Sequence, residues 1–393
     1  MDSRVISQKL RPFGTTIFSE MTRLAQEHGA INLAQGFPDF DGPREILDAA
    51  KRAMDAGENQ YARSLGHPKL VEAIALKYRE HHGLEFDPAS EVVVFCGATE
   101  GIASSLLGLL NPGDEVILFE PYYDSYPVCV ALAGATARFC TLTFPDFRVT
   151  EAELAPLFTP RTRLLLLNSP HNPTGRVFAR EELELVSRLC RERDVLVVSD
   201  EVYEHITFDG ARPTPIASLP GMRERTLTLS STGKTFSLTG WKIGWGVGPK
   251  EMVAAAQAAH QYVTFAVATP FQVAMAEAIG RFRGDYFAQL QRDYLERRDF
   301  LVSVLREVGF EVAAPQGAYF VLADFTRRFP PERFGDDRAV ARLLCEKHGV
   351  AAIPPSVFYS RQPEEGRRLL RFAFCKRMET LRLAAERLRR IGR

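Results

Sequence analysis

The chain has 393 residues, of which 46% are hydrophobic and 25% are charged, and 49 basic residues balance 49 acidic ones. This is the composition of a soluble protein with room for two domains, and a formal net charge of zero provides no basic field for nucleic acid or an anionic membrane. Because no apolar run is long enough to cross a bilayer and the N-terminus lacks the apolar core of a signal peptide, we expect a cytoplasmic protein.

The cysteines and histidines indicate neither a disulfide framework nor a metal site. The six cysteines are scattered without a Cys-x-x-Cys pair, and the eight histidines form no cluster with metal-ligand spacing. We therefore expect reduced cysteines, most of them in the core, and no bound metal. His260, within a helical pattern, is interpreted as a packed residue rather than an acid–base group.

The N-terminal part of the chain shows little periodicity. Residues 11–19 are interpreted as a loop, and residues 35–40 combine turn formers with aromatic side chains. Helical spacing is clear over residues 66–83, where Gly83 is a stop signal.

From residue 91 onward, short apolar runs alternate with helical segments, which indicates a largely parallel sheet covered on both faces. A helix is expected after the first strand, as far as residue 110, and another over residues 181–193. The expected strands are residues 92–95, 116–119, 163–167, 195–198, 226–229 and 240–245.

Ligands of such sheets bind beyond the carboxyl ends of the strands. The polar or glycine-rich segments after these strands contain Thr99, Tyr123, Asn172, Asp200 and Lys234. We therefore expect these side chains to converge on one site.

After residue 250 a long helical tract reaches about residue 308, with interruptions near Pro270 and Gly284. The remainder indicates a smaller α+β domain. Its expected strands are residues 319–323, 351–353 and 370–374, and its last helix is residues 378–390.

Lys234 stands among small hydroxyl residues between two apolar strands, which is a poor place for a solubilising charge. It suits a phosphate ligand or a reactive amine, because a desolvated amine loses its proton readily. Residues 233–235 copy the end of a phosphate-binding P-loop, but the glycine that this motif needs five positions before Gly233 is Thr228 here. The P-loop interpretation therefore fails.

The residues around Lys234 suggest a particular ligand. Asp200 ends a buried strand and needs a cationic partner, such as a protonated pyridine ring, while Lys234 can form a Schiff base with an aldehyde. Ala98, Thr99, Ser231 and Lys242 are suited to bind a phosphate dianion. Tyr123 could stack on a ring, and Asn172 and Tyr203 could donate to a phenolate oxygen. Together these groups describe pyridoxal 5′-phosphate.

Four motifs, in this order along the chain, resemble those of the class I/II aminotransferases of PLP fold type I. They are Asn-Pro-Thr-Gly at 172–175, Ser-Asp-Glu-Val-Tyr at 199–203, Ser-Thr-Gly-Lys-Thr at 231–235 and Gly-Trp-Lys-Ile-Gly at 240–244. The resemblance covers essentially the whole chain. Residues 35–40, 239–242 and 260–261 are similar to the kynurenine–glutamine aminotransferase branch and to bacterial methionine aminotransferases.

The resemblance implies an α/β fold with a large and a small domain. The large domain, residues 46–284, has a mostly parallel seven-stranded sheet covered by helices on both faces. Residues 285–393 form the smaller α+β domain, and residues 1–45 form an N-terminal arm that contributes to it. The resemblance also implies a homodimer with shared active sites.

The resemblance also implies roles for the cofactor-binding residues. Lys234 forms the Schiff base and moves a proton, Asp200 pairs with the pyridine nitrogen, and Asn172 and Tyr203 contact the phenolate oxygen while Tyr123 stacks on the ring. The catalytic set is Lys234, Asp200 and Tyr203.

The phosphate site implied by the resemblance consists of Ala98, Thr99, Ser231 and Lys242, with Tyr61 reaching it from the neighbouring subunit. Many relatives have arginine in place of Lys242. The lysine keeps the charge but loses the guanidinium fork, and the kynurenine and methionine branches share it.

The substrate site implied by the resemblance has Arg371 as the bidentate partner of the α-carboxylate. Phe265 enters the side-chain pocket across the dimer. The other implied substrate-binding residues are Gly36, Asn172, Tyr123 and Tyr61. An apolar or aromatic pocket is expected from Phe13, Phe18, Phe37, Tyr61, Tyr123 and Phe265.

The expected activity is transamination between an L-amino acid and a 2-oxo acid, by a ping-pong cycle through pyridoxamine phosphate. The amino acid would have an apolar, aromatic or amide side chain, as in methionine, glutamine, phenylalanine, tyrosine or kynurenine. One alternative is a carbon–sulfur β-lyase acting on cysteine S-conjugates, since a leaving group on Cβ turns the same carbanion toward elimination. A non-catalytic PLP-binding regulator would need a DNA-binding module, and no basic patch indicates one.

Overall fold

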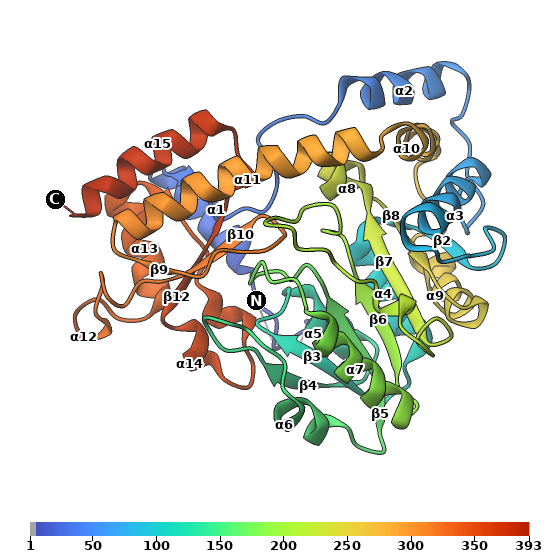
Figure 1. Ribbon diagram of the computed structural model, residues 1–393, viewed down its shortest axis with the longest axis horizontal. Coiled ribbons are helices and arrows are strands. Elements are labelled where there is room, and N and C mark those ends of the chain that lie inside the picture. The colour runs from blue at the N-terminus through green and yellow to red at the C-terminus, as the bar shows by residue number, and fades with distance from the viewer. Residues whose placement is uncertain (1–4, 393) are drawn as a thin grey trace.

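The computed structural model describes residues 5–392, and its largest element is a sheet of seven strands (Figure 1). The strands follow the order β2-β8-β7-β6-β5-β3-β4. Neighbours from β7 to β4 pair in parallel, whereas β8 is antiparallel to both β2 and β7. The mostly parallel seven-stranded sheet implied by the family resemblance is confirmed. Its strands are β2 (Val92–Cys96), β3 (Glu115–Glu120), β4 (Thr136–Thr141), β5 (Thr162–Asn168), β6 (Leu196–Asp200), β7 (Thr226–Ser231) and β8 (Ile243–Val247).

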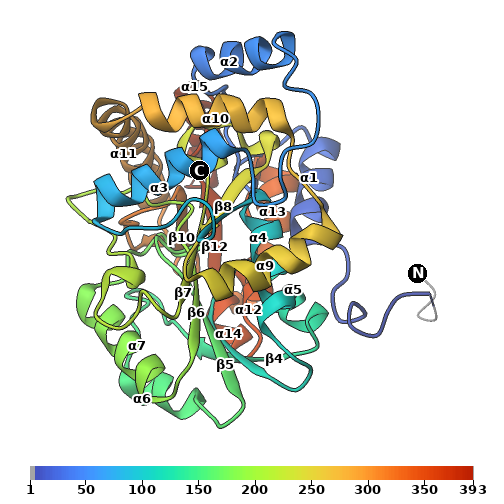
Figure 2. The same cartoon turned by 90° about the vertical axis from the view of Figure 1, so that its right-hand side faces the viewer.

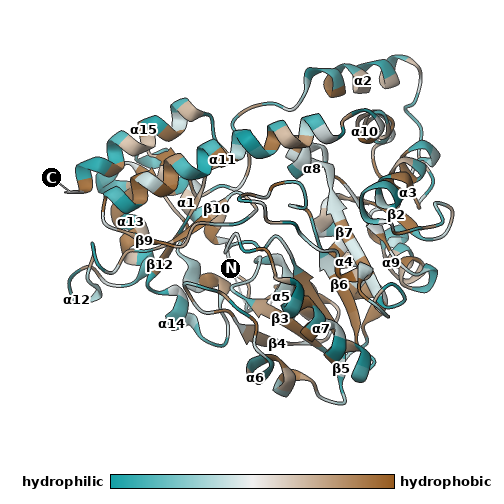
Figure 3. Ribbon diagram, viewed as in Figure 1, coloured by the Kyte–Doolittle hydropathy of each residue, from teal (hydrophilic) through white to brown (hydrophobic). Residues whose placement is uncertain are grey.

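Helices cover both faces of this sheet, which explains why its strands are apolar without interruption. Successive side chains of a strand point to opposite faces, so Val116 and Leu118 of β3 join one core and Ile117 and Phe119 join another. Figure 2 shows the sheet nearly edge-on between the two layers, and Figure 3 shows apolar strands inside hydrophilic helix surfaces. One layer is α4 (Gly97–Leu109), α5 (Ser125–Leu132) and α9 (Lys250–Val263); the other contains α7 (Arg180–Glu192).

Three more helices pack at the end of the sheet where β2 and β8 lie (Figure 1). Leu70 and Met275 of these helices share a core with Trp245 of β8. The helices are α2 (Arg44–Asp55), α3 (Pro68–His82) and α10 (Thr269–Arg281). The helix expected over residues 66–83 corresponds to α3, and it ends at Gly83, whose φ of 65° is left-handed.

A second body of structure joins the N-terminal segment to the C-terminal third of the chain. Met21 shares a core with Leu344 and Leu381. A three-stranded antiparallel sheet, in the order β12-β10-β9, and a parallel pair, β1 with β11, give this part the α+β arrangement expected. Its elements are α1 (Ile17–Glu27), β1 (Ile31–Asn32), α11 (Gly284–Glu307), β9 (Glu311–Val312), β10 (Phe320–Asp324), α13 (Asp337–His348), β11 (Val350–Ala351), β12 (Leu369–Ala373) and α15 (Met378–Leu388).

The domain boundaries at residues 45 and 284 stay a prediction, and residues 1–4 of the expected arm lie outside the described residues. The remaining helices are short: α6 (Glu151–Leu154), α8 (Thr232–Thr235), α12 (Pro331–Phe334) and α14 (Pro363–Gly366). Among the helices of residues 5–392, none is long and apolar enough to cross a membrane.

Two local expectations were wrong. The loop expected over residues 11–19 ends at Thr16, whose hydroxyl accepts a hydrogen bond from the Ser19 N–H and caps α1. The strand expected over residues 240–245 starts only at Ile243, because residues 239–241 form a 3₁₀ turn and Lys242 is left-handed with a φ of 55°. In both places a turn residue, rather than hydrophobic periodicity, decides where the element begins.

The packing of α4 against α9 depends on Gly108. A Cβ atom added at Gly108 would lie 2.1 Å from the carbonyl oxygen of Ala255, a backbone atom that cannot move aside. We predict that Gly108→Ala destabilises the protein by about 1–3 kcal/mol, the usual cost of overpacking. The measurement is the shift of the thermal unfolding midpoint.

The matched control is Gly280→Ala, in the last turn of α10, where no atom lies within 4 Å of the added Cβ. There the substitution should stabilise by about 0.5–1 kcal/mol, because alanine loses less backbone entropy than glycine in a helix. A Gly108→Ala protein as stable as Gly280→Ala would contradict the packing argument.

Candidate active site

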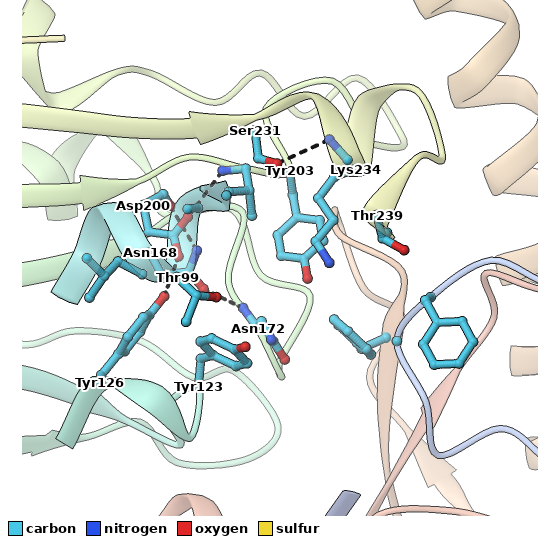
Figure 4. A pocket seen from close by; sticks show the side chains of 18 of the residues that line it. Thr99, Tyr123, Tyr126, Asn168, Asn172, Asp200, Tyr203, Ser231, Lys234 and Thr239 are labelled. Carbon is cyan, nitrogen blue, oxygen red and sulfur yellow. Dashed lines mark hydrogen bonds between the residues drawn. The ribbon is translucent and has the colours of Figure 1, made fainter. Parts of the chain in front are cut away.

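A cavity of about 270 Å³ lies beyond the carboxyl ends of β2, β5, β6 and β7. It is closed on the far side by residues of the N-terminal segment and of β10 and β12, and Figure 4 shows its polar side chains pointing inward. Most residues singled out from the sequence line this single space: Gly36, Ala98, Thr99, Tyr123, Asn172, Asp200, Tyr203, Ser231, Lys234, Lys242 and Arg371.

Lys234 lies in the short helix α8, directly after β7. The hydroxyl of Ser231 caps this helix by accepting a hydrogen bond from the Gly233 N–H at 3.1 Å. Burial lowers the pKa of Lys234 to about 8, and the positive charges of Lys242 and Arg371 act in the same direction. Near pH 8 about half of the Lys234 amine is therefore unprotonated, whereas an ordinary lysine is almost fully protonated there. A nucleophile or a proton carrier needs such a readily deprotonated amine.

Asp200 ends β6 and is 4% exposed. Its carboxylate accepts hydrogen bonds from Tyr126 Oη at 2.7 Å and from the Val202 N–H at 3.3 Å. Within residues 5–392 it has no ion-pair partner, and burial raises its pKa. A buried carboxylate that borders a cavity and has no ion-pair partner among the described residues suits a ligand that carries a cationic nitrogen.

The start of α4 and the start of β8 form a cradle for an anion. Cys96 at the end of β2 pairs with Ile243 at the start of β8, so Gly97 and Lys242 lie side by side. Gly97 has a left-handed φ of 74°, and a Cβ there would lie 2.8 Å from Lys242 Nζ, so a larger residue would strain the backbone and displace the end of the lysine. The first N–H groups of a helix and an ammonium group at the same place favour a phosphate dianion.

Arg371, on β12, is a cation buried without a carboxylate. It is 1% exposed, and burial lowers its pKa to about 10. Nη1 donates to Asn172 Oδ1 at 3.3 Å and Nη2 donates to the Ala34 carbonyl at 2.9 Å, while Nε is buried without a partner in residues 5–392. The guanidinium carbon lies 4.3 Å from the ring centroid of Phe320. Such a group is suited to bind a carboxylate that enters the cavity.

Three of the aromatic residues expected around the substrate do not line the cavity of their own chain. They are Phe13, Tyr61 and Phe265, whereas Phe18, Phe37 and Tyr123 do line it. Tyr61 is 84% exposed and Phe265 is 44% exposed, and their rings meet edge-to-face at 5.1 Å. Within one chain, therefore, this aromatic pair is a surface feature.

The structure also adds residues that were not singled out from the sequence. Asn168 Oδ1 accepts from the Asn172 N–H at 2.7 Å, and Asn168 Nδ2 donates to the Asp200 carbonyl at 2.8 Å. The position of Asn168 at a strand end was a usable signal. Tyr126 had none, because it lies within a helix and its contact with Asp200 spans 74 positions.

No group of three or more His, Cys, Asp or Glu residues is placed to hold a metal ion anywhere in the described range 5–392. The arrangement can instead hold an aromatic ligand that carries an anionic group at one end and a cationic nitrogen at the other. It places a weakly basic amine in the same cavity as a guanidinium that lacks a carboxylate.

The chain is similar to known proteins over most of its length. The family model described as "Aminotransferase class I and II" matches residues 28–388. The solved structure of N-succinyldiaminopimelate aminotransferase from Mycobacterium tuberculosis is 44% identical, covers 98% of this chain and 100% of its own, and superposes with a TM-score of 0.94. Methionine aminotransferase of Escherichia coli is 41% identical, covering 98% of this chain and 97% of the relative. Human kynurenine–oxoglutarate transaminase 1 is 38% identical, covering 94% of each chain.

The methionine and kynurenine branches expected from the motifs are thus among the relatives. N-succinyldiaminopimelate aminotransferase is a third branch that the motifs did not suggest. The likeness in three dimensions confirms fold type I.

The lowered pKa of Lys234 predicts the pH dependence of its reactivity. Only the neutral amine attacks an acylating reagent, so the rate in cofactor-free protein should rise with pH and level off above pH 8, rather than near the ordinary value of 10.5. Trace labelling with acetic anhydride, followed by peptide mass spectrometry, measures this rate for each lysine.

Lys250, whose side chain is 71% exposed, provides the internal comparison in the same digest. A Lys234 rate that still rises beyond about pH 10 would show that burial does not lower its basicity.

Proposed function

The chain belongs to the class I and II aminotransferases, which use pyridoxal 5′-phosphate, and on that premise we propose that it transfers the amino group of an L-amino acid with an apolar, aromatic or amide side chain to a 2-oxo acid. The observation that carries the proposal is the cavity shared by Lys234, Asp200 and Arg371, three charged groups without ion-pair partners in the described chain.

The residues of the cavity fit the cofactor at each of its functional groups. The Asp200 carboxylate would hold the pyridine nitrogen, and the Tyr123 ring would lie against the pyridine face. Asn172 and Tyr203 would donate to the phenolate oxygen. The phosphate would be bound by the N–H groups of Ala98 and Thr99, Ser231 Oγ and Lys242 Nζ. When bound, the cofactor supplies the electron sink that makes the Cα proton of an amino acid acidic.

Arg371 and Lys234 divide the handling of the substrate. The guanidinium of Arg371 would bind the α-carboxylate and thereby fix the position of Cα. Lys234 Nζ would remove the Cα proton and return it to the cofactor carbon C4′, a task suited to a pKa of about 8. The same residues serve a 2-oxo acid in the reverse direction, so ping-pong kinetics follow.

The preference for an uncharged side chain follows from the wall of the cavity. Phe18, Phe37 and Tyr123 supply aromatic surface. The cations that line the cavity within residues 5–392 are Lys234, Lys242 and Arg371. Lys234 would move the proton, Lys242 would bind the phosphate and Arg371 would bind the α-carboxylate, so none is left for a side-chain carboxylate. N-succinyldiaminopimelate carries further carboxylates away from the reacting carbon, and these would need another cation.

A second copy of the chain would complete the site. Tyr61 and Phe265 form an exposed aromatic pair, and Tyr262 and Val263, which shortly precede Phe265 in the chain, are 91% and 61% exposed. Contiguous exposed apolar residues of this kind mark association surfaces. We therefore infer a homodimer in which Tyr61 and Phe265 enter the partner's cavity, at the phosphate and at the substrate side chain respectively.

A substrate panel tests the proposal. With one 2-oxo acid as acceptor, kcat/KM should be highest for methionine, glutamine, phenylalanine or kynurenine. It should be lower for aspartate and N-succinyldiaminopimelate, whose side-chain carboxylates meet no further cation among the described residues that line the cavity. A highest value for aspartate or for N-succinyldiaminopimelate would contradict the preference. The carbon–sulfur lyase alternative would be identified by pyruvate release from a cysteine S-conjugate without added oxo acid.

Arg371→Lys should raise KM for both amino and oxo acids by about 10- to 100-fold, because lysine cannot form the bidentate charge-assisted hydrogen bonds of the guanidinium. The cofactor should remain bound. The control is Arg368→Lys, since Arg368 lies outside the cavity, is 40% exposed and pairs with Asp324. A KM unchanged in Arg371→Lys would remove Arg371 from the substrate site.

A further inference from the structure

The carboxylate of Asp200 is held by one side chain from another layer of the fold. Tyr126, on α5, donates from Oη to Asp200 Oδ2 at 2.7 Å, and the Val202 N–H donates to Oδ1 at 3.3 Å. Tyr126 is 3% exposed and Asp200 is 4% exposed, so little water competes for either group. Across residues 5–392, Tyr126 is the only side chain that hydrogen-bonds to this carboxylate.

The backbone of Asp200 is fixed separately, by the sheet. Its carbonyl accepts from Asn168 Nδ2 at 2.8 Å and from the Ser169 N–H at 3.2 Å. These bonds set the position of Cα but leave the rotation of the side chain free. The direction of the carboxylate therefore depends on Tyr126 and, more weakly, on Val202.

The same hydrogen bond affects the charge of Asp200. Burial raises the pKa of Asp200, and the bond from Tyr126 is the foremost interaction that lowers it. Burial and the nearby carboxylate raise the pKa of Tyr126 well above its usual range, so the phenol keeps its proton and is the donor. Without Tyr126 the carboxylate would face its desolvation with one backbone N–H and the more distant charge of Lys234.

We propose that Tyr126 is a positioning residue that keeps Asp200 ionised and directs it at the pyridine nitrogen of the cofactor. The inference rests on the role proposed for Asp200 and adds a residue that acts through it. Tyr126 also meets the ring of Tyr123 edge-to-face at 5.6 Å. One aromatic ring thus supports both the carboxylate and the residue that would stack on the cofactor.

A purely structural role for the phenol is the competing explanation, and Tyr122 provides the matched control. Tyr122 is also buried, at 6% exposed, and its hydroxyl lies 2.7 Å from Ser360 Oγ. Tyr122→Phe and Tyr126→Phe each delete one buried, hydrogen-bonded hydroxyl from the same segment. Only the second deletion concerns Asp200.

The test follows the ring nitrogen itself, in holoenzyme loaded with pyridoxal phosphate that carries ¹⁵N in the pyridine ring. The ¹⁵N NMR shift, recorded against pH, reports whether that nitrogen is protonated. Without the Tyr126 hydrogen bond the Asp200 carboxylate is more basic and competes better for the proton of the ring nitrogen. At neutral pH the ¹⁵N shift in Tyr126→Phe should therefore move toward that of an unprotonated nitrogen, with the ratio of protonated to unprotonated nitrogen falling about tenfold. Cofactor loss during dialysis should be about tenfold faster, and Tyr122→Phe should match wild type in both measurements.

A second variant keeps the inference testable if Tyr126→Phe folds poorly. Replacement of Tyr126 by 3-fluorotyrosine retains the ring and the hydroxyl and makes the phenol a stronger donor. The stronger hydrogen bond makes Asp200 less basic, so at neutral pH the ¹⁵N shift should lie nearer that of a protonated nitrogen than in wild type. An unchanged titration in 3-fluorotyrosine protein, or in well-folded Tyr126→Phe, would overturn the inference.

Asp200→Asn separates this inference from the proposed site. If the cofactor nitrogen bound to Asp200→Asn titrates as in wild type, Asp200 does not have the role proposed for it, and the inference about Tyr126 is wrong as well. If Asp200→Asn shifts the titration but Tyr126→Phe does not, only the inference falls. In the Asp200→Asn background, Tyr126→Phe should add little, whereas a structural role would add its full effect.

Discussion

The register of three parallel strands decides where this protein can carry out chemistry. β5, β6 and β7 pair so that Asn168 lies opposite Asp200, and Asp200 lies opposite Leu229. Parallel strands present their carboxyl ends at one edge of a sheet, so residues far apart in the chain meet there. A shift of one residue in β6 would turn Asp200 to the opposite face of the sheet, where α7 packs instead of α4 and α5.

The reversed strand β8 completes the cavity that the parallel strands begin. Because β8 is antiparallel to β2, its first residue, Ile243, lies beside the last residue of β2, Cys96. Lys242, directly before β8, is thereby placed next to the N-terminus of α4, the helix that follows β2. Gly97 and Gly244 make this approach possible, since a Cβ on Gly244 would lie 2.7 Å from the Ala98 nitrogen. The Lys242 ammonium and the N-terminus of α4 both favour an anion, and they are adjacent because β8 is antiparallel to β2.

The charges collected in this way are unfavourable for the protein alone. Burial lowers the pKa values of Lys234 and Arg371 to about 8 and about 10, and it raises that of Asp200. Each shift is in the direction that removes charge from a desolvated group. Buried groups with shifted pKa values are typical of sites whose ligands bring the opposite charges. The shifts at Lys234, Arg371 and Asp200 therefore indicate that the cavity is a binding site rather than a packing defect. The cofactor and the substrate carboxylate both meet that description.

The sequence by itself determined where most of the strands lie along the chain, the family and most of the side chains that line the cavity, because strands, turns and motifs are local patterns. Thr99, Asn172, Asp200 and Lys234 could be found from their positions after apolar strands. Tertiary structure alone decided that Tyr126 holds Asp200, that Lys242 reaches Gly97 through a left-handed turn, and that Phe13 does not line the cavity. The hydrogen bond between Tyr126 of α5 and Asp200 of β6 depends on how the helix layer packs against the sheet. The sequence around Tyr126 shows only a helix, and it does not indicate which strand end that helix will contact.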